Sequence, residues 1–586
     1  MRASLVILLS IALAAGVAVV AAQDQELDLA EGEGIPQGSS PIGGLAFVDE
    51  VEVTVVNVVA YVTDKDGNAI DDLTREDFQL FQDGEERPIS NFQVYTKELI
   101  RNTYQSQEPT VLERPPAAAE TDEGDAEDED LTEIQPIWMM IFVDNDNLRP
   151  LDRNRVFNQA RDFIRDNVQP PVQMMVVEFS KTLKVVQDFT IEGDQVLGAL
   201  RELKMHTAGR TNRDSARNEF YDELDRFSQG QGSSQDQSFN RARSMAFGFA
   251  EEEQNSLQFT IGAIREAVNM MSGLPGKKMI LYISNGLAMI PGIDLFYAMA
   301  NTFDDPGMIT EGTRYNQSRQ FDSIVKNANA QGVTFYTIAA GGLENVNMGS
   351  AQYHGPRDTI SSSVGYSNYL DTLRMMADET GGVAIFNTND VGPKLVRIEQ
   401  DFYDYYSIGY NLQATGSDRV HRIKLTIPDH PDYRIRYRRR IVEKSLESRV
   451  QDRVLTGLVI PLEDNPLGIV VGTSNPAPTS GSRWTVPFEL SFALEKIALF
   501  PAGEDYVGQV TFFLAARDTA GKQSDLVRQE HEVRIPAADY EEALRERFTI
   551  TAALLMEAGS YKVSVGLLDN FTRQVGFSTS SVFVGQ

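Results

Sequence analysis

Between residues 137 and 386, short apolar runs alternate with stretches in which apolar residues recur at helical spacing. The apolar runs are residues 137–143, 173–179, 278–284, 333–339 and 383–386, and the helical patterns are about 151–167, 194–204, 256–272, 318–331 and 367–380. This alternation predicts an α/β domain with a doubly wound, mostly parallel sheet and helices on both faces. In such sheets, functional side chains gather where strands end and loops begin.

Polar residues follow two of these predicted strands. The first run, IWMMIFV, continues directly into Asp144 and Asp146, and Asn285 follows the run KMILYIS. Thr211 lies in a third polar stretch, HTAGRTNRD. Carboxylate, amide and hydroxyl oxygens are the ligands of hard cations. The sequence therefore predicts a candidate divalent-cation site, for Mg²⁺, Mn²⁺ or Ca²⁺, formed by Asp144, Asp146, Thr211 and Asn285.

The N-terminus has the pattern of an export signal. Arg2 precedes the apolar run LVILLSIALAAGVAVVA, and small residues at 20–22 offer a cleavage site before Gln23. An uncleaved anchor helix remains the alternative, because the run approaches the length that a bilayer requires. With cleavage, no later segment is apolar enough to span a membrane, and we expect a periplasmic or secreted protein. The chain contains no cysteine, so it forms no disulfides.

The net charge narrows the classes of partner. The chain has 53 basic and 85 acidic residues, which gives a formal charge of -32. So negative a chain is repelled by the phosphates of nucleic acids and by anionic membranes. Cationic partners, or simple solubility, agree better with this charge.

The segments outside the α/β pattern differ in composition. Residues 46–104 alternate valine with polar residues and turn at Asp66-Gly67 and Asp83-Gly84, which is typical of β-hairpins. Residues 450–586 show the turn spacing of an immunoglobulin-like β-sandwich. The predicted divisions are a signal peptide (1–22), a flexible leader (23–45), a small β domain (46–104), an acidic linker (105–135), the α/β domain (136–403), a β extension (404–445) and the C-terminal β-sandwich (450–586).

The order of these features resembles the von Willebrand factor A domain, with a strand that ends in aspartate, a loop containing Gly209 and Thr211, and an apolar strand before Gly286. The flanks VVAYVTDKDGNAIDDLTREDFQLFQDGEERPISNF and YDYYSIGYNLQ to YRIRYRRR are similar, more narrowly, to the VWFA-related Acidobacterial domain family of exported bacterial proteins. The resemblance covers about residues 46–442. It implies a von Willebrand A-like sheet and a role in binding proteins.

The resemblance also implies roles for particular residues. The family binds a divalent metal through an Asp-x-Ser-x-Ser motif, a threonine and a later aspartate, and a partner's carboxylate completes the coordination. Asp144 matches the first aspartate and Thr211 matches the threonine. Asp146 stands at the first serine, Leu148 at the second and Asn285 at the later aspartate. The implied site is therefore a degenerate metal-ion-dependent adhesion site.

Two readings of this degenerate site remain open. Ca²⁺ tolerates irregular ligand sets better than Mg²⁺, so a cation is one possibility. In the other, Arg210 forms an ion pair with Asp144 or Asp146 and replaces the metal, which leaves a polar pocket.

Two insertions interrupt the α/β pattern, near residues 212–254 and 287–317. Both follow the expected carboxyl edge of the sheet, so they form either a lid or partner-binding surface around the site, or a helical or disordered decoration.

An enzymatic role has no support in the residues. The five histidines are scattered without metal-ligand spacing, and the chain has no Gly-x-Ser-x-Gly motif. We therefore expect a protein that is not an enzyme: an adhesion-type protein that binds an unknown protein partner at the carboxyl edge. The alternative is a structural or assembly subunit of the cell envelope that makes its contacts through the β domains.

Overall fold

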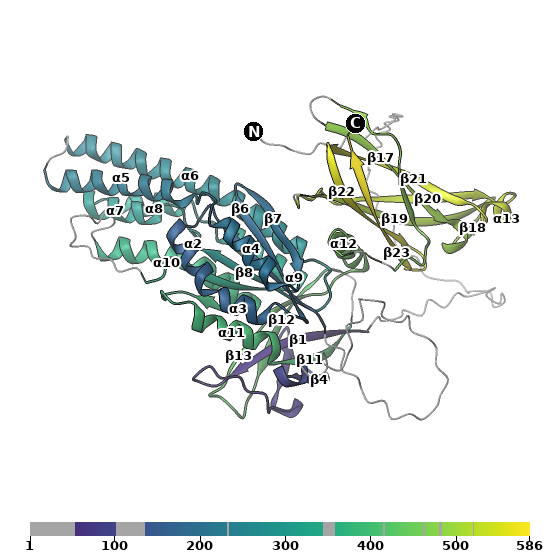
Figure 1. Cartoon of the computed structure of the whole chain (residues 1–586), viewed down its shortest axis with the longest axis horizontal. Helices are drawn as coiled ribbons and strands as arrows, with labels where there is room; N and C mark the ends of the chain where they lie inside the picture. Colours follow the sequence, from purple (N-terminus) through teal and green to yellow (C-terminus); the bar gives the residue numbers. More distant parts are fainter. Residues whose placement is uncertain are drawn as a thin grey trace, which may run out of the picture.

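The computed structural model describes residues 53–585, except 101–134, 231–233, 344–357, 414–416, 461, 463, 480–482 and 520 (Figure 1). The predicted signal peptide, the leader and nearly all of the acidic linker lie outside the described residues. Within the described part of the chain, no helix combines the length and the apolar content needed to cross a membrane.

The α/β domain is built on a six-stranded sheet with the order β10-β9-β8-β5-β6-β7. Every neighbouring pair is parallel except β6 and β7, which are antiparallel. The strands are β5 (Ile137–Asp144), β6 (Val172–Ser180), β7 (Thr182–Thr190), β8 (Lys277–Ser284), β9 (Val333–Ala339) and β10 (Ala384–Ile385). Strand β7 is not among the predicted strands, because it is a half-exposed edge strand without a continuous apolar run.

Both faces of this sheet are apolar and covered by helices. Along β5, Met139, Ile141 and Val143 pack into one core, and the alternating residues between them pack into the other. The first face carries α2 (Pro150–Gln159), α3 (Arg161–Asn167), α4 (Gly193–Leu203) and α11 (Gly392–Tyr403), and the second carries α6 (Gln235–Met270), α9 (Ser318–Gln331) and α10 (Thr359–Thr380). The predicted doubly wound α/β architecture is confirmed, and its mixed sheet agrees with a von Willebrand A-like arrangement.

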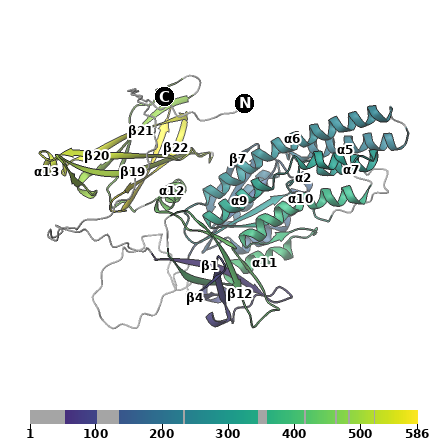
Figure 2. The same ribbon diagram turned by 180° about the vertical axis from the view of Figure 1, so that it is seen from behind.

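The two predicted insertions are helical and pack on each other. Together they contribute α5 (Arg210–Ser228), the first half of α6, α7 (Ile293–Phe303) and α8 (Gly307–Thr313), which are called the helical insertion below. Their shared core contains Phe220, Phe249, Phe296 and Met299, all buried. In Figures 1 and 2 the paired helices α5 and α6 extend well beyond the sheet, with α7 beside them.

The segments before and after the α/β domain form one composite β domain. One of its sheets has the order β13-β1-β11-β4 and the other β14-β12-β2-β3. The strands are β1 (Val53–Thr63), β2 (Gln79–Gln82), β3 (Glu85–Arg87), β4 (Ile89–Tyr95), β11 (Tyr405–Gln413), β12 (Val420–Thr426), β13 (Arg434–Tyr437) and β14 (Arg440–Val442). The two segments that the sequence analysis had separated, 46–104 and 404–445, thus share both sheets and one core. The predicted hairpin at Asp83-Gly84 joins β2 to β3, and both turn residues have positive φ.

The composite β domain packs against the amino end of the α/β sheet. The Nζ of Lys277, the first residue of β8, lies 3.6 Å from the centre of the Tyr405 ring and 5.1 Å from the centre of the Tyr61 ring. Arg436 of β13 forms an ion pair with Asp401 at 2.6 Å. Because these contacts occupy the amino end, the carboxyl end of the sheet is left to the helical insertion and the candidate site.

The C-terminal region consists of two antiparallel sheets with a common core. One sheet contains β15 (Val470–Thr473), β16 (Ala477–Pro478), β17 (Arg483–Ala493) and β21 (Arg547–Glu557), and the other contains β18 (Phe500–Ala502), β19 (Asp505–Asp518), β20 (Val527–Pro536), β22 (Gly559–Asp569) and β23 (Val575–Val584). Helix α12 (Leu446–Gly457) packs on the second sheet. It also joins the α/β domain, because the hydroxyl of Ser272 donates to Asp452 at 2.7 Å.

Candidate functional site at the carboxyl edge

Asp144 ends β5 and is fully buried. Its Oδ1 accepts hydrogen bonds from the backbone N–H of Asn147 at 3.3 Å and from the Asn147 amide at 2.9 Å. Its Oδ2 accepts from the hydroxyl of Ser284 at 3.0 Å, from the Tyr282 hydroxyl and again from the Asn147 amide. Burial raises the pKa of the Asp144 carboxyl, and these donors offset only part of that effect. The carboxyl is thus saturated by donors from its own chain.

Asp146 lies two residues further, between the helical insertion and the loop before α5. Its Oδ2 accepts from the Ser256 hydroxyl at 3.1 Å and from Arg213 at 3.3 Å. Arg213 also donates to the backbone carbonyl of Asp146 at 2.5 Å. A Cβ at Gly209 would stand 2.7 Å from Oδ1 of Asp146, so the loop approaches this carboxylate as closely as a glycine permits.

Asn285 forms hydrogen bonds at the sheet edge, whereas Thr211 lies exposed on a helix. The Oδ1 of Asn285 accepts from the backbone N–H of Arg149 at 3.1 Å, and its amide donates to Asp152 at 2.7 Å. Asn285 therefore holds the start of α2 against the end of β8. Thr211 is the second residue of α5 and is exposed, rather than lying in a loop.

These residues do not fit a shared divalent cation as they are placed. Asp144 already accepts from three side chains, and the oxygen of Asn285 accepts from a backbone N–H. Leu148, at the second serine of the family motif, is fully buried and supplies no oxygen. Across the described residues, no group of three or more histidine, aspartate or glutamate side chains is arranged to hold a metal ion. Of the predicted set, Asp144, Asp146 and Asn285 lie in one hydrogen-bonded junction at the end of β5 and β8, whereas Thr211 lies on α5.

The arginine that pairs with the motif is not the one considered from the sequence. Arg213, rather than Arg210, contacts Asp146. Arg210 instead lies over the ring of Tyr369 at 4.6 Å and pairs with Asp214 at 3.4 Å. Both arginines belong to α5, one turn apart, so the helix presents two guanidinium groups to the same edge.

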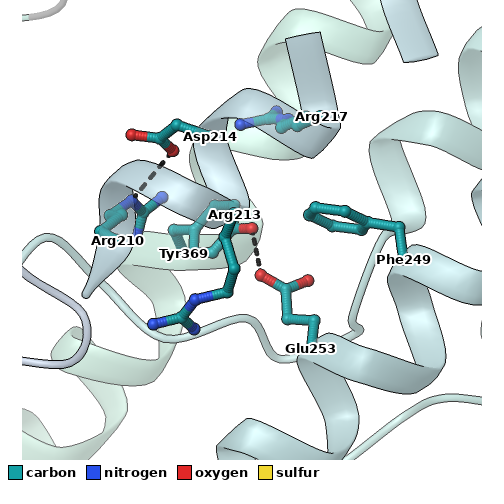
Figure 3. Close-up of a pocket in the computed structure, with 7 residues that line it drawn as sticks. All are labelled: Arg210, Arg213, Asp214, Arg217, Phe249, Glu253 and Tyr369. Atoms are coloured by element: carbon teal, nitrogen blue, oxygen red, sulfur yellow. Dashed lines mark hydrogen bonds and ion pairs between the residues drawn. The ribbon is translucent and has the colours of Figure 1, made fainter. Parts of the chain in front are cut away.

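A small pocket lies between α5 and α6 beside this junction (Figure 3). Figure 3 shows the arginines of α5 opposite Phe249 and Glu253 of α6. Its lining residues are Arg210, Arg213, Asp214, Arg217, Phe249, Glu253 and Tyr369.

The arginines and Asp214 around the pocket form ion pairs, whereas Glu253 accepts from the Tyr369 hydroxyl and the Gly292 backbone N–H. Arg217 donates to the buried Asp294 at 2.6 Å, and the hydroxyl of Tyr221 donates to the same oxygen at 2.5 Å. Burial would raise the pKa of the Asp214 carboxyl, but the guanidinium groups of Arg210 and Arg149 lower it on balance. These ion pairs connect α5 to α7 and to the end of β5.

Hydrogen bonds from α2 fix the loop that precedes α5. Arg153 of α2 is buried and donates to the side-chain oxygen of Asn145 at 2.6 Å and to the backbone carbonyls of Lys204 and His206, each at 3.0 Å. Asn145 in turn donates to Glu178 at the end of β6 at 2.9 Å. The loop and the start of α2 therefore form one fixed surface.

Two large apolar side chains project from that surface. Leu151, in the first turn of α2, is 82% exposed, and Met205, in the loop before α5, is 86% exposed. These are the highest values for large hydrophobic residues in the described part of the chain. Contiguous exposed apolar patches, rather than single exposed side chains, are typical of protein-binding surfaces.

Sequence reasoning located the edge but missed most of the groups that determine its chemistry. Tyr282 and Ser284 lie on the same face of β8 as each other, so the period of two in KMILYIS was a usable signal. Asn147 and Arg213 were visible only as members of polar stretches. Nothing in the sequence indicates that Leu151 and Met205 are exposed.

No protein-family description matches the chain, and no curated protein matches it. Among solved structures, an aerotolerance-related membrane protein from Bacteroides fragilis aligns with 45% of this chain and 98% of its own at 9% identity, with a TM-score of 0.22. BatB from Bacteroides thetaiotaomicron aligns with 46% of this chain and 98% of its own at 8% identity and a TM-score of 0.20.

A third structure is the manganese-loaded TRAP protein of Plasmodium vivax, which aligns with 68% of this chain and 93% of its own at 8% identity and a TM-score of 0.20. At these TM-scores the likeness carries no argument about fold or function. The assignment of the α/β domain rests on its own strand order.

Proposed function

We propose that this protein is exported and binds a partner protein at the carboxyl edge of its von Willebrand A-like sheet, without a bridging metal. The supporting observation is the exposure of Leu151 and Met205 on a surface that Arg153 and Asn145 hold fixed. Covering a side chain of this size contributes about 1.5–3 kcal/mol, so each of the two residues can contribute to an anchor for association.

The proposal extends to the type of protein. We propose membership of the VWFA-related Acidobacterial type, because the two flanks that carry the resemblance contribute strands to the same composite β domain. The partner is proposed to be a protein, since Leu151 and Met205 are exposed at this edge and the net charge of -32 disfavours nucleic acid.

Site-specific photo-crosslinking in cells that produce the protein tests this proposal. A photoreactive residue at Met205 should give a discrete crosslinked product, and the same residue at Val470, which is 56% exposed in the C-terminal region, should not. The crosslinked partner is then identified and titrated against the purified chain. The double variant Leu151→Asp/Met205→Asp should weaken binding at least about tenfold, and a chelator should leave it unchanged. Equal crosslinking at both positions, or full affinity in the double variant, would contradict the proposal.

A second candidate function is a structural subunit of the cell envelope, and one observation favours it. Phe500 and Phe571 lie edge to face at 5.1 Å in the C-terminal region and are 55% and 47% exposed. If this region is an immunoglobulin-like contact platform, Phe500→Asp should abolish association with envelope fractions, and Leu151→Asp/Met205→Asp should preserve it. The opposite result supports docking at the carboxyl edge.

A further inference from the structure

Strand β21 forms an open edge of the first C-terminal sheet. It pairs with β17 along its entire length, from Arg547 opposite Ala493 to Glu557 opposite Arg483. Among the described residues it pairs with no other strand. An edge strand of 11 residues offers a row of free backbone donors and acceptors to another chain.

The direction of those backbone groups follows from one contact on β17. The carbonyl of Pro487 accepts from the backbone N–H of Ser474 at 3.2 Å, on the side of β17 away from β21. Pro487 stands opposite Ala553, so this pair is not hydrogen bonded, and the backbone groups of Ala553 point to the open edge. By alternation, those of Thr549, Thr551 and Leu555 point the same way.

This edge lacks the protection that another strand of the same region has. Strand β20 also pairs with a single described strand, and its exposed positions carry Arg528, Glu530, Glu532 and Arg534. Charges on an edge strand prevent pairing with other chains. The exposed positions inside β21 are instead Thr549, Thr551 and Ala553, which are small and uncharged.

We propose that two copies of this chain pair through β21, antiparallel, about a two-fold axis at Ala552. In that register Arg547 of each copy lies opposite Glu557 of the other. The two opposite charges pair at each end when the Arg547 guanidinium exchanges its hydrogen bonds to Ser491 and to the Gly468 carbonyl for the partner copy's Glu557 carboxylate. Thr551 lies opposite Ala553 and Thr549 opposite Leu555, so the residues with outward backbone groups face each other and exchange hydrogen bonds. A two-fold interface uses the same surface on both copies, as this register requires.

The inference is independent of the proposed partner binding, which concerns a different domain. The ionic strength has a defined effect. Each copy carries a formal charge of -32, so repulsion between copies opposes dimerisation at low salt and is screened at physiological salt. We therefore expect the dimer fraction to increase between about 0.02 and 0.15 M salt, over which the Debye length falls steeply.

Sedimentation of the whole processed chain, recovered from a host that exports it, tests the proposal. Thr551→Pro should give a monomer, because its ring replaces an outward N–H and leaves the bonds to β17 intact. Thr551→Val keeps the N–H and should remain dimeric, as the matched control. Arg547→Glu alone and Glu557→Arg alone should each weaken the dimer, since each places like charges opposite each other.

The double variant Arg547→Glu/Glu557→Arg decides the register. It should restore dimerisation, because the swapped charges again lie opposite each other across the two-fold axis, whereas a defect in folding would persist or worsen. A wild-type chain that stays monomeric up to about 100 µM at physiological salt overturns the proposal. So does a dimer that survives Thr551→Pro, or a double variant that remains as weak as the single ones.

Discussion

Asp144 shows how one side chain determines the character of the carboxyl edge. A carboxylate that is to bind a metal needs a free oxygen directed toward open space. Here Tyr282, Ser284 and Asn147 occupy both oxygens, and the residue is fully buried. The end of the strand at Asp144 was predictable from the apolar run before it. The donors that fill its oxygens come from β8 and from the turn. The period of two places Tyr282 and Ser284 on one face of β8, but nothing in the sequence indicates that this face meets Asp144.

Divalent cations should have no specific site at this edge. Calorimetric titration of the purified chain with magnesium, manganese and calcium chlorides up to about 1 mM should give no saturable heat from this edge, because the oxygens of Asp144 and Asn285 already accept hydrogen bonds. A saturable signal that disappears in Asp144→Ala would instead restore the degenerate metal site.

Removing the Asp144 carboxyl should destabilise the fold. Asp144→Ala leaves the buried donors of Tyr282, Ser284 and Asn147 without an acceptor, which should cost about 2–4 kcal/mol of unfolding free energy. Urea denaturation followed by fluorescence measures this loss. The exposed Asp162, changed to alanine, is the control and should alter stability by less than about 0.5 kcal/mol.

Lys277 should make stability depend on pH. Burial lowers the pKa of its ammonium group from 10.5 to about 7. Between these values the unfolded chain holds the proton and the folded chain does not. Stability should therefore rise with pH in this window, by about 1.4 kcal/mol per pH unit for this group. Urea midpoints at pH 7.5, 8.5 and 9.5 should rise less steeply in Lys277→Met than in the wild type, and Lys424→Met, at an exposed position, should not change the slope.

At the scale of elements, the helical insertion is the largest departure from what the sequence shows. Its pattern was assigned to a helix only from residue 256, whereas α6 begins at Gln235. The missed turns are rich in glutamine, asparagine and charged residues, and their apolar stripe consists mainly of alanines such as Ala242 and Ala246. Helix α5 is still more polar, and its packing depends on ion pairs with elements distant in sequence. Local periodicity cannot reveal such pairs.

The Arg217–Asp294 pair should hold α5 and α7 together. Arg217→Met leaves the Asp294 carboxylate buried without its cation, which should cost about 3–5 kcal/mol. Hydrogen exchange should accelerate in α5 and α7 but not in β5 and β8. Replacing both residues, as Arg217→Met/Asp294→Leu, should recover most of the protection, since no uncompensated charge then remains. Uniform acceleration over the whole α/β domain would contradict a local role.

At the scale of the whole molecule, one domain is formed by two segments that are far apart in the sequence. The α/β domain is inserted between β4 and β11 of the composite β domain. The hydroxyl of Tyr406, for example, accepts from the backbone N–H of Leu73, 333 positions away in the sequence. The alternating patterns of both flanks were predictable as strands. The pairing of these strands was not predictable, because an alternating pattern does not indicate which strand it pairs with.

Deleting the N-terminal flank should therefore destabilise the composite β domain, including its strands that follow the α/β domain in the sequence. A chain that begins at Gln135 lacks β1 and β4, both neighbours of β11, and exposes the apolar residues Tyr406, Ile408 and Tyr410. We expect this chain to aggregate on expression, as measured by the soluble fraction. Supplying residues 46–104 as a separate polypeptide should restore solubility. If the truncated chain is soluble on its own, the two flanks do not depend on each other.

The insertion of one domain within another also sets an order of assembly. Synthesis begins at the N-terminus, so β1 and β4 are complete long before β11 exists to join them. They wait as unpaired strands while the α/β domain folds, and that domain has its own core. Folding of the insert brings Tyr95 and Tyr405 together as a stacked pair at 4.5 Å, and this shortens the loop that the two flanks must close. Folding of the α/β domain thus brings the strands that are synthesised first close to those that are synthesised last.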